Sequence, residues 1–310
     1  MQTPNLIRLY TFLLLLGLLI MGCKKERIEN QVVKDTEKSY PFKIVTNIMD
    51  FQCADTLESG WQIIEYINNS SETHFVLFDK YPEGKSNEEI TQIFQSGMDF
   101  IAEGEAEAGF AEFGKLPAWF AEVVYTGGTG LIGPESTARS IIHLAPGHYY
   151  IECYVKMPNG KFHTSMGMSK ALYVKGKKST LIPPQPNVRL ELSGDRGIQI
   201  LDTVARGRQI FKVHFKDQVV HENFVGHDIN LARIDAGADV EILEAWMNWA
   251  NPNGLVSPAP AGFTFLGGVN DMPGGSVGYF EAELTPGEYV LISEVPEARK
   301  KNMLKVFQVD

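Results

Sequence analysis

One short motif occurs twice in this chain of 310 residues, and its repetition constrains the fold most strongly. The pattern Leu-x-Pro-Gly-x-Tyr occupies residues 144–149 and returns at residues 284–289, a displacement of 140. A looser similarity relates residues 73–78 to residues 226–231. A Pro-Gly turn that leads into β-branched and aromatic residues is typical of strand connections. The repeat therefore predicts two domains of related β structure.

The runs between the turns are short and rich in β-branched and aromatic residues, which favours a mainly β architecture. Further strands are expected at 42–45, 62–67 and 171–174 in the first half, and at 188–192, 209–215 and 290–293 in the second. Apolar residues at helical spacing also predict one helix in each half. The first begins after Ser86, which forms a capping-box pattern with Glu89, and the second begins near Val240.

Three Gly-Gly pairs follow the predicted helices, at residues 127–128, 267–268 and 274–275. None of them has the Gly-Lys-Ser/Thr ending of a phosphate-binding loop, so all three are interpreted as turns.

These patterns together predict a mainly β protein with two tandem Greek-key β-sandwich domains, each with a helical insertion. The first domain is expected at residues 41–175 and the second at residues 188–310. Residues 176–187 between them are rich in Lys and Pro and are expected to form a semi-rigid linker. Residues 1–22 and 23–40 precede the fold as a signal peptide and a polar tether.

The first 22 residues have the pattern of an export signal. Arg8 precedes the apolar run Phe12–Met21, and the small residue Gly22 follows. The stretch Leu19–Cys23 resembles the lipobox of a bacterial lipoprotein signal, although Met21 is an unusual occupant of its position. An ordinary secretory signal beside an incidental Cys is the alternative.

The lipoprotein resemblance implies that Cys23 becomes the acylated first residue of the mature chain, with fatty acyl chains such as palmitate. Each buried CH₂ of such a chain contributes about 0.8 kcal/mol, so several chains anchor a protein firmly in a bilayer. Lys24 and Lys25 follow with no Asp beside them. By resemblance to known sorting rules, this favours the outer membrane as the location in the cell envelope.

The formal net charge of −10 excludes a generally basic protein. No cluster of Lys and Arg lies on a long predicted helix, so nucleic acid is not expected as a partner.

Cysteine, histidine and methionine gather in and after the first copy of the repeated motif. Cys153 lies near the end of a predicted strand, and His163 and Met168 follow in the next loop. His74 begins another strand, which can meet this loop at one end of a sandwich. Two imidazoles, a thiolate and a weak axial thioether form the ligand set of electron-transfer copper sites. Met166 is the competing axial ligand.

This set resembles the cupredoxin, or type 1 blue-copper, family, in which an early strand His is followed by Cys, His and Met around the final loop. The spacing Cys-x9-His-x4-Met is longer than in small blue-copper proteins and closer to the nitrite reductase and multicopper oxidase branch. The resemblance implies one copper ion in the first domain and one-electron transfer. It departs at Phe75, where the family often has a small polar residue that hydrogen-bonds the Cys sulfur.

The second domain is expected to bind no metal. It keeps His227, but Ser293 occupies the position of Cys153, and Met303 is the remaining soft atom in the region. A disulfide between Cys153 and Cys53, which lies in an expected strand, would remove the thiolate that the copper site needs.

Oxidases and nitrite reductases of this family have His next to the copper Cys, whereas Glu152 and Tyr154 flank Cys153 here. The resemblance therefore implies an electron carrier rather than an enzyme, with a redox partner that the sequence does not identify. A metal-free scaffold for a partner or ligand, and copper storage or delivery, are the alternatives.

Overall fold

The computed structural model describes residues 41–310, which belong to one compact unit. The predicted signal peptide (1–22), lipidation site (Cys23) and tether (23–40) lie outside the described residues. Within residues 41–310, no helix combines the length and apolar character needed to cross a bilayer.

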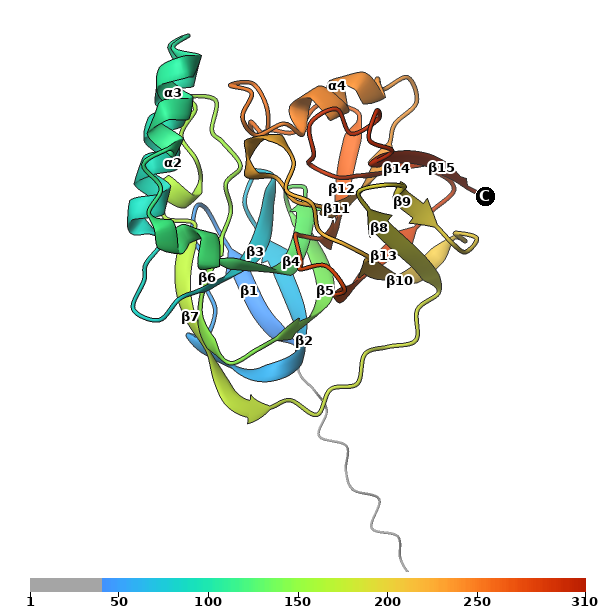
Figure 1. The fold of residues 1–310 in the computed structure, drawn as a ribbon. Coiled ribbons are helices and arrows are strands. Elements are labelled where there is room, and N and C mark those ends of the chain that lie inside the picture. Colours follow the sequence, from blue (N-terminus) through green and yellow to red (C-terminus); the bar gives the residue numbers. More distant parts are fainter. Residues whose placement is uncertain (1–40) are drawn as a thin grey trace, which may run out of the picture. The chain divides into compact units, whose positions relative to one another are not determined.

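The first half is built from strands and two adjacent helices (Figure 1). Its strands are β1 (Phe42–Thr46), β2 (Thr56–Asn68), β3 (His74–Tyr81), β4 (Val124–Ile132), β5 (Ser136–Leu144), β6 (Gly147–Glu152) and β7 (Ser169–Lys178). The helices α2 (Glu88–Ala102) and α3 (Ala106–Phe113) and the 3₁₀ turn η1 (Ala118–Glu122) lie between β3 and β4, and η2 (Thr164–Met166) precedes β7. One layer pairs β1 with β2 in parallel and β2 with β5 antiparallel. The other has the order β4-β3-β6-β7.

The second half repeats this pairing pattern. Its strands are β8 (Val188–Ser193), β9 (Gly197–Ile200), β10 (Gly207–Phe215), β11 (Ile229–Ile234), β12 (Phe263–Val269), β13 (Val277–Leu284), β14 (Gly287–Ile292) and β15 (Leu304–Val309). β8 pairs with β10 in parallel and β10 with β13 antiparallel, while the other layer has the order β12-β11-β14-β15. The helix α4 (Val240–Trp246) and the turn η3 (Glu222–Phe224) complete this half. The predicted mainly β fold with two related Greek-key halves and helical insertions is confirmed.

Hydrogen bonds join the two halves. β5 pairs with β13, and β4 pairs with β12 through Ile132 and Leu266. The Asn270 side chain donates to the carbonyl oxygens of Val76 and Thr129 in the first half. β7 continues to Lys178, into the segment predicted as a linker. The domain boundaries remain predictions, but the halves share sheet edges as well as side-chain contacts.

Two of the three Gly pairs are not turns, so that interpretation was wrong for them. Residues 127–128 lie within β4 and residues 267–268 within β12. Gly128 and Gly268 have φ of +150° and +157°, and a Cβ on either would collide with a backbone carbonyl oxygen of the neighbouring strand. The partner strands shift register nearby. These glycines therefore form irregularities inside strands, which bend the sheet without ending it.

Two local predictions also need correction. The N-cap of α2 is Asn87 instead of Ser86, and its side chain makes no cap bond; its amide nitrogen donates to Ser169 in β7. The tertiary contact displaces the local capping box. Cys53 lies in a bend after an isolated bridge between Val45 and Gln52, and not in a strand.

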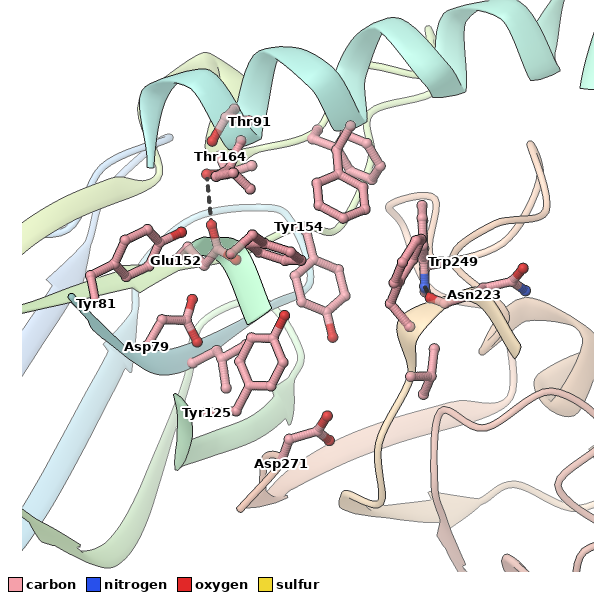
Figure 2. A pocket seen from close by; sticks show the side chains of 17 residues that line it. Asp79, Tyr81, Thr91, Tyr125, Glu152, Tyr154, Thr164, Asn223, Trp249 and Asp271 are labelled. Atoms are coloured by element: carbon pink, nitrogen blue, oxygen red, sulfur yellow. Dashed lines mark hydrogen bonds between the residues drawn. The ribbon is translucent and has the colours of Figure 1, made fainter. Parts of the chain in front are cut away.

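A cavity of about 90 Å³ lies where strands β3, β4 and β6 and helix α2 approach the second half (Figure 2). Its walls come from both halves, including residues 223–225 and Trp249 from the second.

Candidate metal centre

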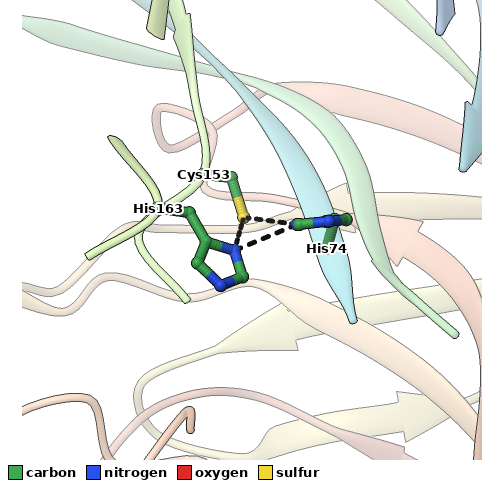
Figure 3. Close-up of side chains that lie close together, drawn as sticks. All are labelled: His74, Cys153 and His163. Atoms are coloured by element: carbon green, nitrogen blue, oxygen red, sulfur yellow. Dashed lines mark hydrogen bonds between the residues drawn. The ribbon is translucent and has the colours of Figure 1, made fainter. Parts of the chain in front are cut away.

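Three predicted ligands meet at one end of the first half (Figure 3). His74 is the first residue of β3, Cys153 follows the last residue of β6, and His163 ends the loop before η2. All three side chains are completely buried. The Cys153 Sγ atom lies 3.8 Å from Nδ1 of His74 and 3.8 Å from Nδ1 of His163, and the two Nδ1 atoms are 3.0 Å apart. Within residues 41–310 they form a group of metal-ligand type, with all donor atoms within 4.8 Å of one another.

These distances fit one metal ion. A triangle with sides of 3.0, 3.8 and 3.8 Å has its centre about 2.1 Å from each corner. Imidazole nitrogen and thiolate sulfur bind zinc, an ion of similar size, at about 2.0–2.3 Å. A set of two imidazoles and one thiolate is the trigonal set that copper occupies in electron-transfer sites. The donor set and its dimensions therefore fit one copper ion.

A hydrogen-bond network determines which nitrogen of His74 faces the group. The amide nitrogen of Asn68 donates to the carbonyl oxygens of Glu72 and Gly133, so its Oδ1 atom must accept from the Ser70 hydroxyl at 2.7 Å. The Ser70 Oγ atom has then used its proton, and it can only accept from Nε2 of His74, at 2.9 Å. Nε2 therefore carries the hydrogen of the neutral ring. The lone pair of Nδ1 points toward Cys153 and His163, as a metal ligand requires.

The sulfur of Cys153 accepts hydrogen bonds from backbone N–H groups. Burial raises the pKa of this thiol to about 12, while the amides of Phe75 and Val155 act in the opposite direction and the charges of Glu152 and Glu294 raise it further. A thiol in this environment stays protonated unless a cation binds to it. The Phe75 side chain cannot donate to the sulfur, but its backbone N–H does so instead.

Burial also keeps both imidazoles neutral. Loss of solvation lowers the pKa of His74 to about 4, and lowers that of His163 to about 3 with a further contribution from His74. Neutral imidazole is the form that binds metal. At neutral pH neither ring has to lose a proton to water before it binds a metal ion.

The loop that carries His163 is held by backbone hydrogen bonds at both ends. The N–H of His163 donates to the carbonyl of Val155, and the N–H of Met168 donates to the carbonyl of His163. The N–H of Cys153 donates to the carbonyl of Met168. Met168 is fully buried, whereas Met166 is 46% exposed. Burial and backbone contacts thus favour Met168 over Met166 as the axial ligand, which remains a prediction.

The second half has no thiolate at the corresponding place. Ser293 takes the position of Cys153, and its hydroxyl donates to the Asp228 carboxylate at 2.7 Å. His227, the counterpart of His74, is fully buried. The Ser293 hydroxyl therefore has a partner within the protein and offers no soft ligand.

Cys53 and Cys153 are both free thiols, so the disulfide considered as an alternative does not form. Burial raises the pKa of Cys53 to about 11.

The sequence did not reveal which residues orient the ligands. Ser70 lies in a turn-like stretch, and its role depends on Asn68 and on a carbonyl far along the chain. The backbone donors to the sulfur have no side-chain signature. A short polar residue four positions before a strand His is the one signal that the sequence offers, and it is weak.

No family model matches the chain, and no curated protein matches it. Solved structures with some similarity include auracyanin A, a blue copper protein from Chloroflexus aurantiacus, at 19% identity over 44% of this chain and 98% of that one, with a TM-score of 0.29. A copper nitrite reductase from Nitrosomonas europaea is 10% identical over 88% of this chain and 93% of that one, with a TM-score of 0.24. A multicopper oxidase is 13% identical over 87% and 88%, with a TM-score of 0.22. TM-scores this low describe a limited overlap, and the distances and burial of the three ligands carry the chemistry described above.

Proposed function

We propose that the protein is a cupredoxin-like copper protein that carries one electron through a type 1-like site. His74, Cys153 and His163 would hold one copper ion, with Met168 as the weak axial ligand. The observation that carries this proposal is the buried triangle of two Nδ1 atoms and one Sγ atom, whose size matches metal–ligand bonds.

The rigidity of the site supports electron transfer. The bound copper ion would supply a one-electron couple, and the chain would keep the ligands in one arrangement in both oxidation states. Ser70, in the segment between β2 and β3, fixes the His74 ring through its hydroxyl, and backbone hydrogen bonds fix the loop of His163. Complete burial of the three ligands excludes water from the metal and disfavours rapid metal exchange, which storage or delivery would require.

We further propose that the protein is an exported, lipid-anchored carrier in the cell envelope, on the outer membrane. The lipobox-like stretch Leu19–Cys23 and the residues Lys24 and Lys25 support this placement. A carrier, rather than an oxidase, is favoured because Glu152 and Tyr154 flank Cys153 and neither is a His that could lead to a second copper ion.

Electrochemistry of the copper-loaded full-length chain tests the proposed activity. We expect a reversible one-electron Cu(II)/Cu(I) wave that is absent from the apoprotein. A protein that binds copper without a reversible wave, or that gives the metal up rapidly to a mild chelator, would instead be a storage or delivery protein. Membrane fractionation tests the anchor, because Cys23→Ser should move the protein out of the membrane fraction while Cys53→Ser should not.

A further inference from the structure

The cavity beside the metal centre is lined by acidic groups and by no basic residue. Three carboxyl groups line it, from Asp79, Glu152 and Asp271, and no Lys, Arg or His is among its lining residues. Tyrosine hydroxyls lie among the carboxyl groups (Figure 2). Carboxylates enclosed together without a positive charge are costly in a protein interior. A cavity of this kind is complementary to a cation.

Asp79 shows most clearly that a partner is missing. It lies in β3, is 1% exposed, and its Oδ1 atom has no hydrogen-bond partner although it is buried. Burial, the charge of Glu152, a side-chain hydrogen bond with Glu152 and the charge of Asp271 raise the pKa of Asp79 well above its usual value, and they leave only its Oδ1 atom without a partner. An unpartnered buried acceptor at a cavity wall is the arrangement expected where a ligand donates the missing hydrogen bond.

The carboxyl groups are too dispersed to surround a bare metal ion. Within residues 41–310, Asp79, Glu152 and Asp271 do not form a group with all donor oxygens within 4.8 Å. Asp271 also uses its Oδ2 atom to accept from the N–H of Gly226. A larger cation, with several N–H donors that diverge from one centre, suits such a spread of acceptors better than a metal ion does.

Aromatic rings also line the cavity, so a cation that fits it would have an apolar body. The lining rings belong to Phe94, Phe120, Phe162, Phe224 and Trp249. Trp249 is held rigidly, because its Nε1 atom donates to the carbonyl of Asn223 at 2.9 Å and its own carbonyl accepts from Lys156 at 2.7 Å. Aromatic faces attract organic cations and pack against apolar groups.

The size of the cavity limits the ligand. The centres of water molecules could occupy a volume of about 90 Å³ in it. One water needs roughly 10–15 Å³ on this measure, so the space holds a molecule of about six to nine non-hydrogen atoms.

We propose that this cavity binds a small organic ammonium ion with an aromatic or short aliphatic body. The ammonium group donates to Asp79 and its neighbouring carboxyl groups, and the body lies against Phe94 and Trp249. Glu152 and Tyr154, the residues on either side of Cys153, both line the cavity. The ligand therefore lies beside the backbone of the proposed copper ligand. The proposal does not depend on copper, because the acidic and aromatic walls are present without the metal.

Calorimetric titration of the metal-free full-length chain with benzylammonium near neutral pH tests the proposal. We expect saturable binding of one molecule per chain, with a change in tryptophan fluorescence from Trp249. Benzyl alcohol has the same shape without the charge and should bind at least about tenfold more weakly, since hydrogen bonds to charged groups are the stronger ones. Asp79→Asn should weaken benzylammonium binding by a similar factor.

Asp55→Asn is the matched control, because the Asp55 side chain is 80% exposed and lies outside the cavity. It should bind benzylammonium like the wild type. Circular dichroism checks the fold of each variant, and Asp271→Asn replaces Asp79→Asn if the latter does not fold. Equal affinity for benzylammonium and benzyl alcohol would overturn the proposal, as would wild-type affinity in Asp79→Asn or, where that variant does not fold, in Asp271→Asn. Absence of binding to the folded wild type at millimolar concentrations, or displacement of benzylammonium by stoichiometric Ca²⁺, would also overturn it.

Discussion

Replacement of Ser70 by Ala should weaken copper binding without altering the ligand set. The Ser70 Oγ atom accepts the hydrogen of His74 Nε2 at 2.9 Å and thereby keeps the lone pair of Nδ1 directed at the metal position. In Ser70→Ala this hydrogen has lost its acceptor in a fully buried ring. The ring can then adopt the other tautomer, in which the hydrogen on Nδ1 occupies the place of the metal.

The expected loss of affinity is between tenfold and a hundredfold. A buried donor without a partner costs about 1–3 kcal/mol. Removal of the hydrogen-bond partner of a metal-ligating His typically costs about 10–100-fold in affinity, which corresponds to about 1.4–2.8 kcal/mol. Ser70 also accepts from the N–H of Glu72 and donates to Asn68. Those contacts exist with or without metal, so their loss lowers the stability of both forms and leaves the affinity unchanged.

Competition with a chelator of known affinity measures copper binding in Ser70→Ala and in the control Ser71→Ala. Ser71 is exposed, and its hydroxyl contacts Glu72 at 3.5 Å. The absorption band of the bound copper should persist in both variants, because Cys153 is intact. Equal affinities of the two variants would refute the inferred tautomer. So would loss of affinity in Ser70→Ala in proportion to a loss of folded protein, measured by circular dichroism.

Three further predictions concern other parts of the site. Met168→Leu should raise the reduction potential of the copper ion and keep its absorption band, because loss of a weak axial donor destabilises Cu(II) more than Cu(I). Met166→Leu is the control and should leave the potential unchanged. Equal shifts of the potential in voltammetry of the two variants would contradict Met168 as the axial ligand. Burial lowers the pKa of Lys156 to about 7, so this amine binds a proton more tightly in the unfolded chain than in the folded one. The free energy of unfolding of the wild type should therefore rise by up to about 5 kcal/mol between pH ~7 and ~10.5. Lys156→Met should lack this rise when the free energy of unfolding is measured with urea. The same dependence on pH in the variant and the wild type would contradict a lowered pKa of Lys156. The pKa of Asp79 is raised in the folded protein, so this side chain lowers stability at pH values above its usual pKa of 3.8. Ligand-free Asp79→Asn should therefore have a higher melting temperature than the wild type at about pH 8 and lose this advantage toward pH ~4. A difference that does not change with pH would show that Asp79 is not desolvated.

The candidate ligands could be selected from the sequence because most of them are close together in it, and the structure brings His74, Cys153 and His163 into one group. Cys153, His163 and Met168 lie on one strand-loop-strand unit, and the repeat indicated which early strand would supply His74. The second copy acted as a control, since it keeps the Pro-Gly turn but has Ser293 in place of the thiol.

Features that depend on contacts between distant segments were missed. Gly128 and Gly268 were interpreted as turn residues, because a sequence shows that a left-handed backbone conformation is possible but not whether it bends a strand or ends one. Asn87 occupies the N-cap position of α2, and its side chain contacts Ser169 in β7 instead of capping the helix, a contact that no local pattern encodes. The cavity carboxyl groups of Asp79 and Asp271 come from different halves, and their proximity follows from the packing of those halves.

The visible absorption spectrum of the full-length chain with one equivalent of Cu(II) tests the central claim most directly. The wild type and Cys53→Ser should both show intense thiolate-to-copper absorption, and Cys153→Ser should lose it while it keeps its fold. Cys53 is the matched control because it is the other free thiol among residues 41–310. A colourless wild type, or a band that survives in Cys153→Ser, would contradict the assignment of His74, Cys153 and His163 as a copper site.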